Sequence, residues 1–423
     1  MQDNEKKPAL RFKGFTDPWE QRKLGDAFER VVRKNTNNES RLPLTISAQD
    51  GLVDQITYFN NRVASRDVSN YYLVYNGEFA YNKSTSDGYP FGAVKRLDWY
   101  EKGVLSTLYI VFALKHPEKD DSDFMTVFYD TDRWHRGVAE RAAEGARNHG
   151  LLNISADDFF DIDTTMPEDK VEQEKIGRLL KKLDTLITLH QRKYEKLVNI
   201  KKSMLDKMFP QNGASVPEIR FKGFTDPWEQ RKLAELTKTI TTGKSVNSDE
   251  GEVSDGDIGV LKTSCVSYDR FNSSESKPVV KSEQQLVKCA VEKDSVIVSR
   301  MNTPERVGAC GYVSTDFPNL FLPDRLWKLK FQDTVDTYFV YMMLVSSAYK
   351  EKITSMASGT SGSMYNIPKE TFLNLQLVIP AKIDEQKQLG KILKKIDTLI
   401  TLHQRKLEKL QNIKKSCLEK MFV

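Results

Sequence analysis

The chain has few cysteines, few histidines and no long apolar run, and each shortage excludes a class of protein. Its 423 residues include only 4 cysteines and 5 histidines. The cysteines lie in the second half without C-x-x-C spacing, so we expect neither a structural zinc site nor a disulfide framework. No stretch approaches the roughly 18 consecutive apolar residues that a transmembrane helix needs. The polar first ten residues lack the apolar core of a secretion signal, which favours a cytoplasmic protein without a membrane partner.

Positive charge is concentrated in two segments. The formal net charge is only +5. Residues 170–209 and residues 381–423 each carry 11 Lys and Arg against 5 Asp and Glu, so the remainder of the chain is net acidic. A protein that binds DNA through its phosphates alone is usually basic throughout. The other parts of the chain therefore either concentrate their few cations or share a nucleic acid with a basic partner.

The sequence contains two copies of one frame. The string RFKGFTDPWEQRKL occupies residues 11–24 and recurs unchanged at 220–233. Residues 172–209 recur at 385–422 with 28 of 38 positions identical. Repeats of this length are not coincidental, and a chain of 423 residues suits two or three domains. The architecture is therefore a duplication.

Two divergent regions lie inside these frames, at about residues 25–165 and 234–378. Their patterns still align, because residues 78–83 match residues 295–300 as a short apolar segment that ends in a cation. Constant frames around variable inserts are expected when one scaffold presents two different recognition surfaces.

The segment 172–209 and its copy predict two long helices. Neither contains proline, and apolar residues recur every three or four positions along both. At 1.5 Å per residue such a helix is about 55 Å long, roughly one and a half turns of B-DNA, and could serve as a ruler. The alternative is a plain role in dimerisation or domain packing. The seam that we expect to join the two helices comprises Leu183, Leu186, His190, Leu197, Ile396, Leu399, His403 and Leu410.

The two histidines of this seam occupy the same position in the repeat. If the copies pair antiparallel about a pseudo-two-fold axis, His190 and His403 should approach each other near the crossing. Our hypothesis is a polar pair that sets the register, rather than a metal site or a catalytic pair.

The repeated T-D-P-W-E string predicts the start of a short helix. Asp17 and Asp226 suit the N-cap, with proline at the first helical position and glutamate placed for a capping box. We interpret Trp19 and Trp228 as anchors in a domain core rather than as platforms for base stacking.

No catalytic constellation emerges from the motifs. A methyltransferase with fused recognition domains needs an Asn/Asp-Pro-Pro-Tyr/Phe loop, yet the nearest strings are the two copies of D-P-W. The G-K-S string at residues 243–245 ends like a phosphate-binding loop, but Lys238 stands where the first glycine is required. The nuclease-like E-Q-K string at residues 385–387 has no paired acid to hold a metal. We expect neither catalysis nor a metal site in this chain.

The chain resembles the specificity subunits of type I restriction-modification systems over essentially its whole length. The resemblance rests on the W-E-Q-R-K-L string that opens each half, on the lysine-rich helices that end in Lys-Met-Phe, and on a run that closes each divergent region. That run comprises Asn153, Ile154, Phe159, Pro167, Glu172 and Gln173, and again Asn366, Ile367, Phe372, Pro380, Glu385 and Gln386.

The resemblance implies an α+β fold with two α/β target-recognition domains in pseudo-two-fold tandem, separated by two long antiparallel coiled-coil helices. Each domain would read one half of a bipartite asymmetric DNA site through the major groove. The helices would set the unread spacer and dock two modification subunits. The domains expected are a first recognition domain with its frame at 1–168, a long helix at 169–210, a second recognition domain with the repeated frame at 211–380, and a second long helix at 381–423.

The resemblance also implies the partners. Double-stranded DNA is the expected ligand, and restriction-translocase subunits join the two modification subunits in a site-specific deoxyribonuclease and adenine DNA methyltransferase. S-adenosylmethionine, ATP and magnesium are expected on those partners and no cofactor in this chain. Two alternatives are the recognition part of a methyltransferase of another type, and a non-catalytic coiled-coil scaffold with no sequence preference for DNA.

Base reading calls for Arg or Lys at guanine, Asn or Gln at adenine, and small hydroxyls or methyls elsewhere. In the first domain, residues 147–152 depart from the family's glycine- and serine-rich loop, which the second domain keeps at residues 359–363. The DNA contacts that we expect in the second domain are Lys262, Thr263, Ser264, Ser299, Arg300, Asn302, Arg306, Ser361, Ser363, Tyr365 and Asn366. Those expected in the first are Asn82, Lys83, Ser84, Thr85, Lys95, Arg96, Arg147, Asn148 and His149.

Overall fold

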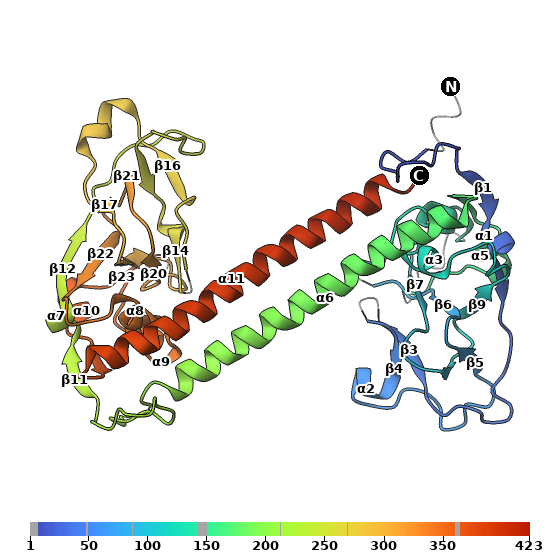
Figure 1. The fold of residues 1–423 in the computed structure, drawn as a ribbon, viewed down its shortest axis with the longest axis horizontal. Helices are drawn as coiled ribbons and strands as arrows, with labels where there is room; N and C mark the ends of the chain where they lie inside the picture. Colours follow the sequence, from blue (N-terminus) through green and yellow to red (C-terminus); the bar gives the residue numbers. More distant parts are fainter. Residues whose placement is uncertain are drawn as a thin grey trace. The chain divides into compact units, whose positions relative to one another are not determined.

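The chain folds into two compact units. The computed structural model describes residues 7–47, 50–86, 88–142, 150–211, 213–268, 270–359 and 364–423. The first unit is Met1–Gln191 with Arg405–Val423, and the second unit is Arg192–Gln404. Each unit contains one divergent region, the opening part of one long helix and the closing part of the other (Figure 1).

The first unit is built on an antiparallel four-stranded sheet in the order β2-β9-β6-β7. These strands are β2 (Phe28–Arg30), β9 (Ile110–Leu114), β6 (Phe79–Asn82) and β7 (Ala93–Arg96). Helices and short strand pairs surround the sheet. They are β1 (Glu20–Lys23), α1 (Leu24–Ala27), β3 (Leu44–Ser47), β4 (Gly51–Asp54), α2 (Gln55–Phe59), β5 (Tyr72–Tyr75), β8 (Lys102–Leu105), α3 (Ser122–Phe128), α4 (His135–Arg141), α5 (Ala156–Phe160) and β10 (Asp163–Met166).

The second unit repeats this plan with an antiparallel sheet in the order β12-β22-β18-β20 and adds a second four-stranded sheet, β16-β13-β21-β17. The first sheet comprises β12 (Thr237–Thr242), β22 (Leu326–Phe331), β18 (Ser295–Ser299) and β20 (Cys310–Val313). The other elements are β11 (Glu229–Lys232), α7 (Leu233–Leu236), β13 (Gly259–Leu261), η1 (Thr263–Cys265), β14 (Val266–Ser267), β15 (Arg270–Phe271), β16 (Ser276–Pro278), η2 (Lys281–Leu286), β17 (Ala290–Val291), β19 (Met301–Asn302), β21 (Phe317–Phe321), α8 (Thr337–Val345), α9 (Ser347–Ser355), β23 (Tyr365–Asn366), α10 (Lys369–Leu373) and β24 (Gln376–Ile379).

The main sheets of the two units have the same layout. Strand β6 lies between β9 and β7, as β18 lies between β22 and β20. The predicted alignment of residues 78–83 with residues 295–300 is therefore confirmed, because both segments form the same inner strand. Two similar mixed domains in tandem, with two long helices, are also what the predicted α+β class requires.

The frame repeat contributes a strand where we predicted a helix start. Strand β1 pairs antiparallel with β10, and β11 pairs in the same way with β24. The short helices begin only afterwards, at Leu24 and at Leu233. The prediction that Asp17 and Asp226 cap a helix is therefore wrong. A strand partner far along the chain outcompetes the local capping signal, and no local pattern reveals such a partner.

The frame tryptophans lie inside the domain cores. Trp19 is 1% exposed and Trp228 is 4% exposed. Their rings make edge contacts with Phe124 and Phe339, respectively. A ring that stacks on a base has to be accessible, so the interpretation of both tryptophans as anchors is confirmed.

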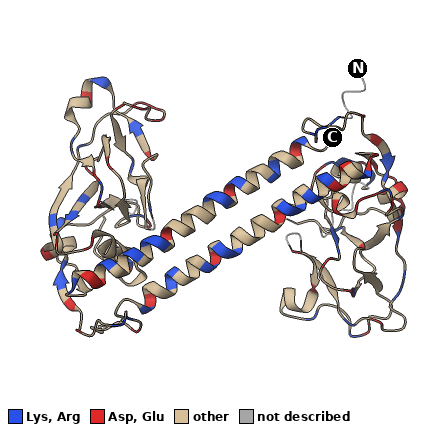
Figure 2. Cartoon of the chain, viewed as in Figure 1, with Lys and Arg blue, Asp and Glu red and all other residues tan. Residues whose placement is uncertain are grey.

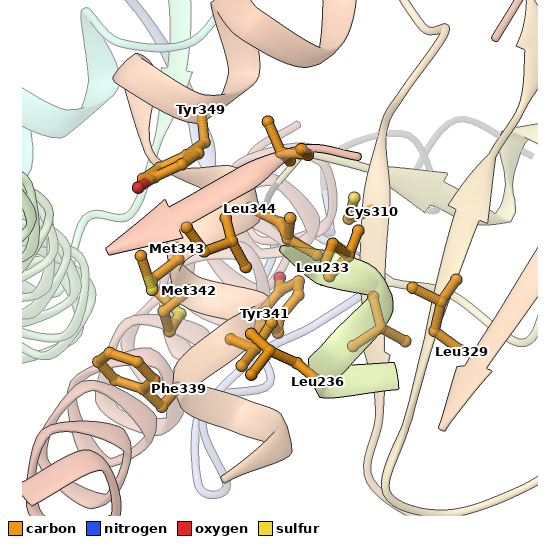
Figure 3. Packing of buried hydrophobic residues seen from close by; sticks show 14 of the residues in the cluster. Leu233, Leu236, Cys310, Leu329, Phe339, Tyr341, Met342, Met343, Leu344 and Tyr349 are labelled. Carbon is orange, nitrogen blue, oxygen red and sulfur yellow. The ribbon is translucent and has the colours of Figure 1, made fainter. Parts of the chain in front are cut away.

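The core of the second unit surrounds α8. Every residue of this helix from Tyr338 to Leu344 is buried, as expected for a helix that is apolar on all sides. Figure 3 shows Phe339 and the residues from Tyr341 to Leu344 in one cluster with Leu233 and Leu236 of α7 and Leu329 of β22. The invariant frame is thus anchored directly in the core of the variable domain.

Two helices of 38 residues each, α6 (Lys170–Lys207) and α11 (Ile383–Lys420), confirm the predicted long helices. Each is about 57 Å long at 1.5 Å per residue. Both end three residues before the predicted boundaries at 210 and 423, because Phe209 and Phe422 leave the helix to enter a domain core. No helix in the described part of the chain is both long and apolar enough to cross a membrane.

Candidate nucleic-acid interface

A two-stranded ribbon beyond the end of β18 gathers several of the predicted DNA contacts. Strand β19 pairs antiparallel with β23, which sets Asn302 opposite Tyr365 and Met301 opposite Asn366. Arg300 forms the link between β18 and β19. The ribbon therefore brings Arg300, Asn302, Tyr365 and Asn366 together from two distant parts of the sequence.

The side chains at this ribbon divide into buried and accessible groups. Ser299 is fully buried, and the side-chain amide of Asn302 donates to its hydroxyl at 3.0 Å, so these two shape the turn from within. Arg300 is half-buried, and its Nε donates to the backbone oxygen of Asp324 at 2.8 Å. Arg306, in the turn that follows β19, is exposed. Arg306 is thus accessible to a ligand.

A third segment of the second unit lies against the same turn. Lys262, Thr263 and Ser264 are half-buried at the start of η1, and Ser264 Oγ donates to Glu275 at 2.5 Å. A few residues on, the hydroxyl of Tyr268 donates to the backbone oxygen of Val307 at 2.7 Å. This bond holds the segment beside the turn that carries Arg306.

The first unit builds an equivalent ribbon beyond the end of β6. Thr85 N donates to the backbone oxygen of Gly150 at 2.7 Å, and Leu152 N donates to that of Lys83 at 3.0 Å. Ser84 stands opposite Leu151 in an isolated bridge. The predicted contacts Asn82, Lys83, Ser84 and Thr85 therefore share one ribbon edge, at the position where the second unit has β19 and β23.

Lys95 and Arg96, also predicted as DNA contacts, are engaged inside the first unit. Lys95 Nζ lies 2.9 Å from Asp130 Oδ1. The Arg96 guanidinium, with a side chain only 11% exposed, pairs with Asp98 at 2.6 Å and with Asp123 at 2.8 Å. A guanidinium held in this way has few donors left for a base. These contacts favour an internal structural role for Lys95 and Arg96.

Five other predicted contacts lie outside the described residues: Arg147, Asn148, His149, Ser361 and Ser363.

The Glu-Gln pair that opens each long helix bonds the helix to its domain. Glu172 accepts two bonds from Arg11, at 2.6 and 2.8 Å, and Glu385 accepts two from Arg220, at 2.7 and 2.8 Å. Each neighbouring glutamine donates to a backbone oxygen before the helix and accepts from a backbone N–H before α3 or α8. The sequence marked these residues as a motif but gave no sign of their partners.

Each long helix ends in the unit in which the other long helix begins. Phe422 stacks on Phe124 with ring centroids 5.6 Å apart, and Phe209 stacks on Phe339 at 5.5 Å. The Lys-Met-Phe ending therefore completes a domain core in both units. Each unit is thus held by the start of one long helix and by the end of the other.

Ion pairs between the two long helices confirm that they run antiparallel. In the first unit, Lys414 Nζ lies 2.7 Å from Asp184 Oδ1. In the second, Lys201 Nζ lies 2.6 Å from Asp397 Oδ1. An offset of 213 residues relates Asp184 to Asp397 and Lys201 to Lys414, so the two pairs are copies of one interaction.

The predicted seam residues lie at varying depth. Leu183 and Ile396 are buried at 7% and 9% exposure. Leu183 and Leu410 pack on the core of the first unit. The register-setting role of the two histidines stays a prediction. The half-buried seam residues are Leu186, His190, Leu197, Leu399, His403 and Leu410.

Charge is distributed as the composition indicated. Figure 2 shows lysine and arginine along the whole length of both long helices and only scattered in the domains. Among the described residues, no group of three or more His, Cys, Asp or Glu side chains is placed to hold a metal ion. What the domains offer a ligand is a ribbon edge with a few cations, hydroxyls and amides.

Comparisons with known proteins agree with one another. Residues 225–412 match the family model of the type I restriction modification DNA specificity domain. The type I restriction enzyme MjaVIII specificity subunit of Methanocaldococcus jannaschii is 23% identical over 321 residues, which cover 74% of this chain and 72% of that protein. The EcoEI specificity subunit of Escherichia coli is 23% identical over 200 residues, which cover 47% of this chain and 34% of that protein.

The fold has a solved counterpart. The crystal structure of the type I restriction-modification system S subunit from M. genitalium superposes with a TM-score of 0.64 and covers 99% of both chains at 14% identity. Residues 225–412, which contain the β19–β23 ribbon, are thus identified as a DNA specificity domain of the type I restriction-modification class. The resemblance found in the sequence is confirmed, because residues 225–412 match the specificity-domain model and the chain is similar to type I restriction enzyme specificity subunits.

Proposed function

We propose that this chain reads a bipartite, asymmetric DNA site, with each unit recognising one half through the major groove. The observation that carries the proposal is the equivalent ribbon of the two units, formed beyond β6 and beyond β18 with different side chains. Both domains carry the same frame string and near-identical long helices, so the main difference between the two surfaces lies in their side chains. Two unlike surfaces suit two unlike half-sites.

The accessible chemistry fits base reading better than tight phosphate binding. In the second unit Arg306 and Arg300 offer guanidinium groups, which pair with guanine, and Tyr365 adds a hydroxyl. In the first unit Asn82 offers an amide that suits adenine, beside the hydroxyls of Ser84 and Thr85. With so few cations at each ribbon, much of the affinity for phosphates has to come from partner subunits.

The partners and the catalytic chemistry follow from the same proposal. The long helices set the length of the unread spacer and dock two modification subunits, and restriction-translocase subunits complete the nuclease. S-adenosylmethionine, ATP and magnesium are bound by those partners, and this chain is not catalytic alone. The complex works on cytoplasmic DNA. A coiled-coil scaffold, the alternative function, would lack any preference for a DNA sequence.

Arg306→Ala should weaken binding of the cognate site by about 1–3 kcal/mol, because an exposed arginine that pairs with a guanine contributes on that order. The measurement is a titration of labelled duplex with the complex of this chain and its modification subunits. Arg231→Ala is the matched control, since Arg231 lies on the frame strand β11 and pairs with Glu235 at 2.5 Å. Equal affinities of the two variants for the cognate site would show that Arg306 does not contact the DNA bases.

A further inference from the structure

Strand β7, at the edge of the main sheet of the first unit, holds both long helices through shared carboxylates. Arg96 pairs with Asp123, and Lys181 of α6 lies 3.3 Å from the same carboxylate oxygen. Lys95 pairs with Asp130, whose other oxygen lies 3.3 Å from Lys414 of α11. Each carboxylate thus stands between a strand cation and a helix cation.

The pair of Asp130 with Lys414 is partly shielded from water, which strengthens it, whereas the side chains of Asp123 and Lys181 are 43% and 33% exposed. The side chains of Asp130 and Lys414 are 22% and 19% exposed. Burial by itself would raise the pKa of Asp130, but Lys95 and Lys414 outweigh it and keep that pKa below its usual range. The carboxylate is therefore charged at neutral pH, and its neutralisation would leave Lys95 without its counter-ion and Lys414 with Asp184 alone.

The second unit uses the same helix positions with different partners. Lys394, the copy of Lys181, lies 3.4 Å from the Tyr312 hydroxyl of β20, the equivalent edge strand. Asp397, the copy of Asp184, accepts a hydrogen bond from the Tyr338 hydroxyl at 2.5 Å and pairs with Lys201. One helix lysine therefore meets a carboxylate in the first unit and, as its copy Lys394, a tyrosine in the second, while Tyr338 adds a bond to the helix carboxylate Asp397.

We infer that Asp123 and Asp130 in the first unit, and Tyr312 and Tyr338 in the second, are positioning residues that fix the orientation of each recognition domain on the long helices. We name these four side chains the helix clamp. The inference rests on the proposed function, because under it the orientation of a domain decides which spacer lengths bring both half-sites into reach. The clamp makes spacer length depend on domain residues as well as on the helices.

The test is the double variant Asp123→Asn with Asp130→Asn, which removes charge while keeping shape. In cells that also express the modification subunit, the methylated half-sites should stay the same. Methylation at sites with one base pair more or fewer in the spacer should rise by about tenfold, equivalent to ~1.4 kcal/mol. Glu140→Gln is the matched control, because Glu140 forms an exposed pair with Arg136 on α4. The conservative Asp130→Glu should keep the spacing of the wild type.

The outcomes separate the inference from the proposed function. A wild-type chain that directs no two-part methylation would overturn the function itself. A wild-type motif together with unchanged spacer selectivity in the double variant would overturn the clamp alone. Should the double variant fail to fold, Tyr338→Phe tests the same idea in the second unit, since it removes only the hydroxyl bonded to Asp397. Relaxed spacing in Tyr338→Phe supports the clamp, and unchanged spacing refutes it.

Discussion

Glu385→Gln is expected to lower the free energy of unfolding of the second unit by about 3–5 kcal/mol, as when one partner of a buried ion pair is removed. The Glu385 carboxylate is 2% exposed and accepts two bonds from Arg220, and the Trp228 indole N–H donates to it at 3.3 Å. The amide keeps the shape but loses the charge, which leaves the guanidinium of Arg220 half-satisfied in a site that is 12% exposed. Urea denaturation followed by tryptophan fluorescence measures the loss.

The repeat supplies its own comparison for this prediction. Glu172→Gln should destabilise the first unit by a similar amount, because Arg11 binds Glu172 with the same two-bond geometry. Glu235→Gln is the control, since Glu235 pairs with Arg231 at an exposed site where such pairs contribute about 0–1 kcal/mol. A loss for Glu385→Gln no larger than that for Glu235→Gln would show that the helix is not anchored by this carboxylate.

Replacement of residues 25–165 by residues 234–378 of the same chain is expected to make the DNA motif symmetric. The proposed function assigns one half-site to each divergent region, so two copies of the second region should read the same half-site twice, in inverted orientation. The graft is compatible with the frames, because Lys181 and Asp184 of the first unit are copies of Lys394 and Asp397, which contact Tyr312 and Tyr338 in the second. Sequencing of methylated DNA from cells with the modification subunit shows the motif.

The reciprocal replacement, of residues 234–378 by residues 25–165, is the control. It should also give a symmetric motif, built from the other half-site. If either chimaera forms a stable complex and still directs the asymmetric motif of the wild type, specificity resides outside the divergent regions and the assignment fails.

The features that could be predicted from the sequence are those that depend on local periodicity or on the comparison of the two repeats. Heptad spacing and the absence of proline predicted α6 and α11 to within three residues at each end. The comparison of the two halves located β6 and β18 as equivalent strands, although residues 78–83 and 295–300 share little sequence. Burial of Trp19 and Trp228 followed from ordinary side-chain preference.

The features that the sequence hid depend on partners far along the chain. The D-P-W-E string has every local mark of a helix start, yet the residues after Trp19 form a strand because β10 is available to pair with them. The internal partners of Lys95 and Arg96 had no signal in the sequence, because Asp123 and Asp130 come from a distant segment and the long helices add a lysine to each. Tertiary proximity of this kind has no signature in one sequence.

The most direct test of the account is to express the wild-type chain with its modification subunit in a host without a type I system, and to map DNA methylation. We predict adenine methylation at a two-part asymmetric motif with a fixed unread gap. A stable complex of the two proteins that leaves the DNA without any new methylated motif would contradict the account and favour a scaffold.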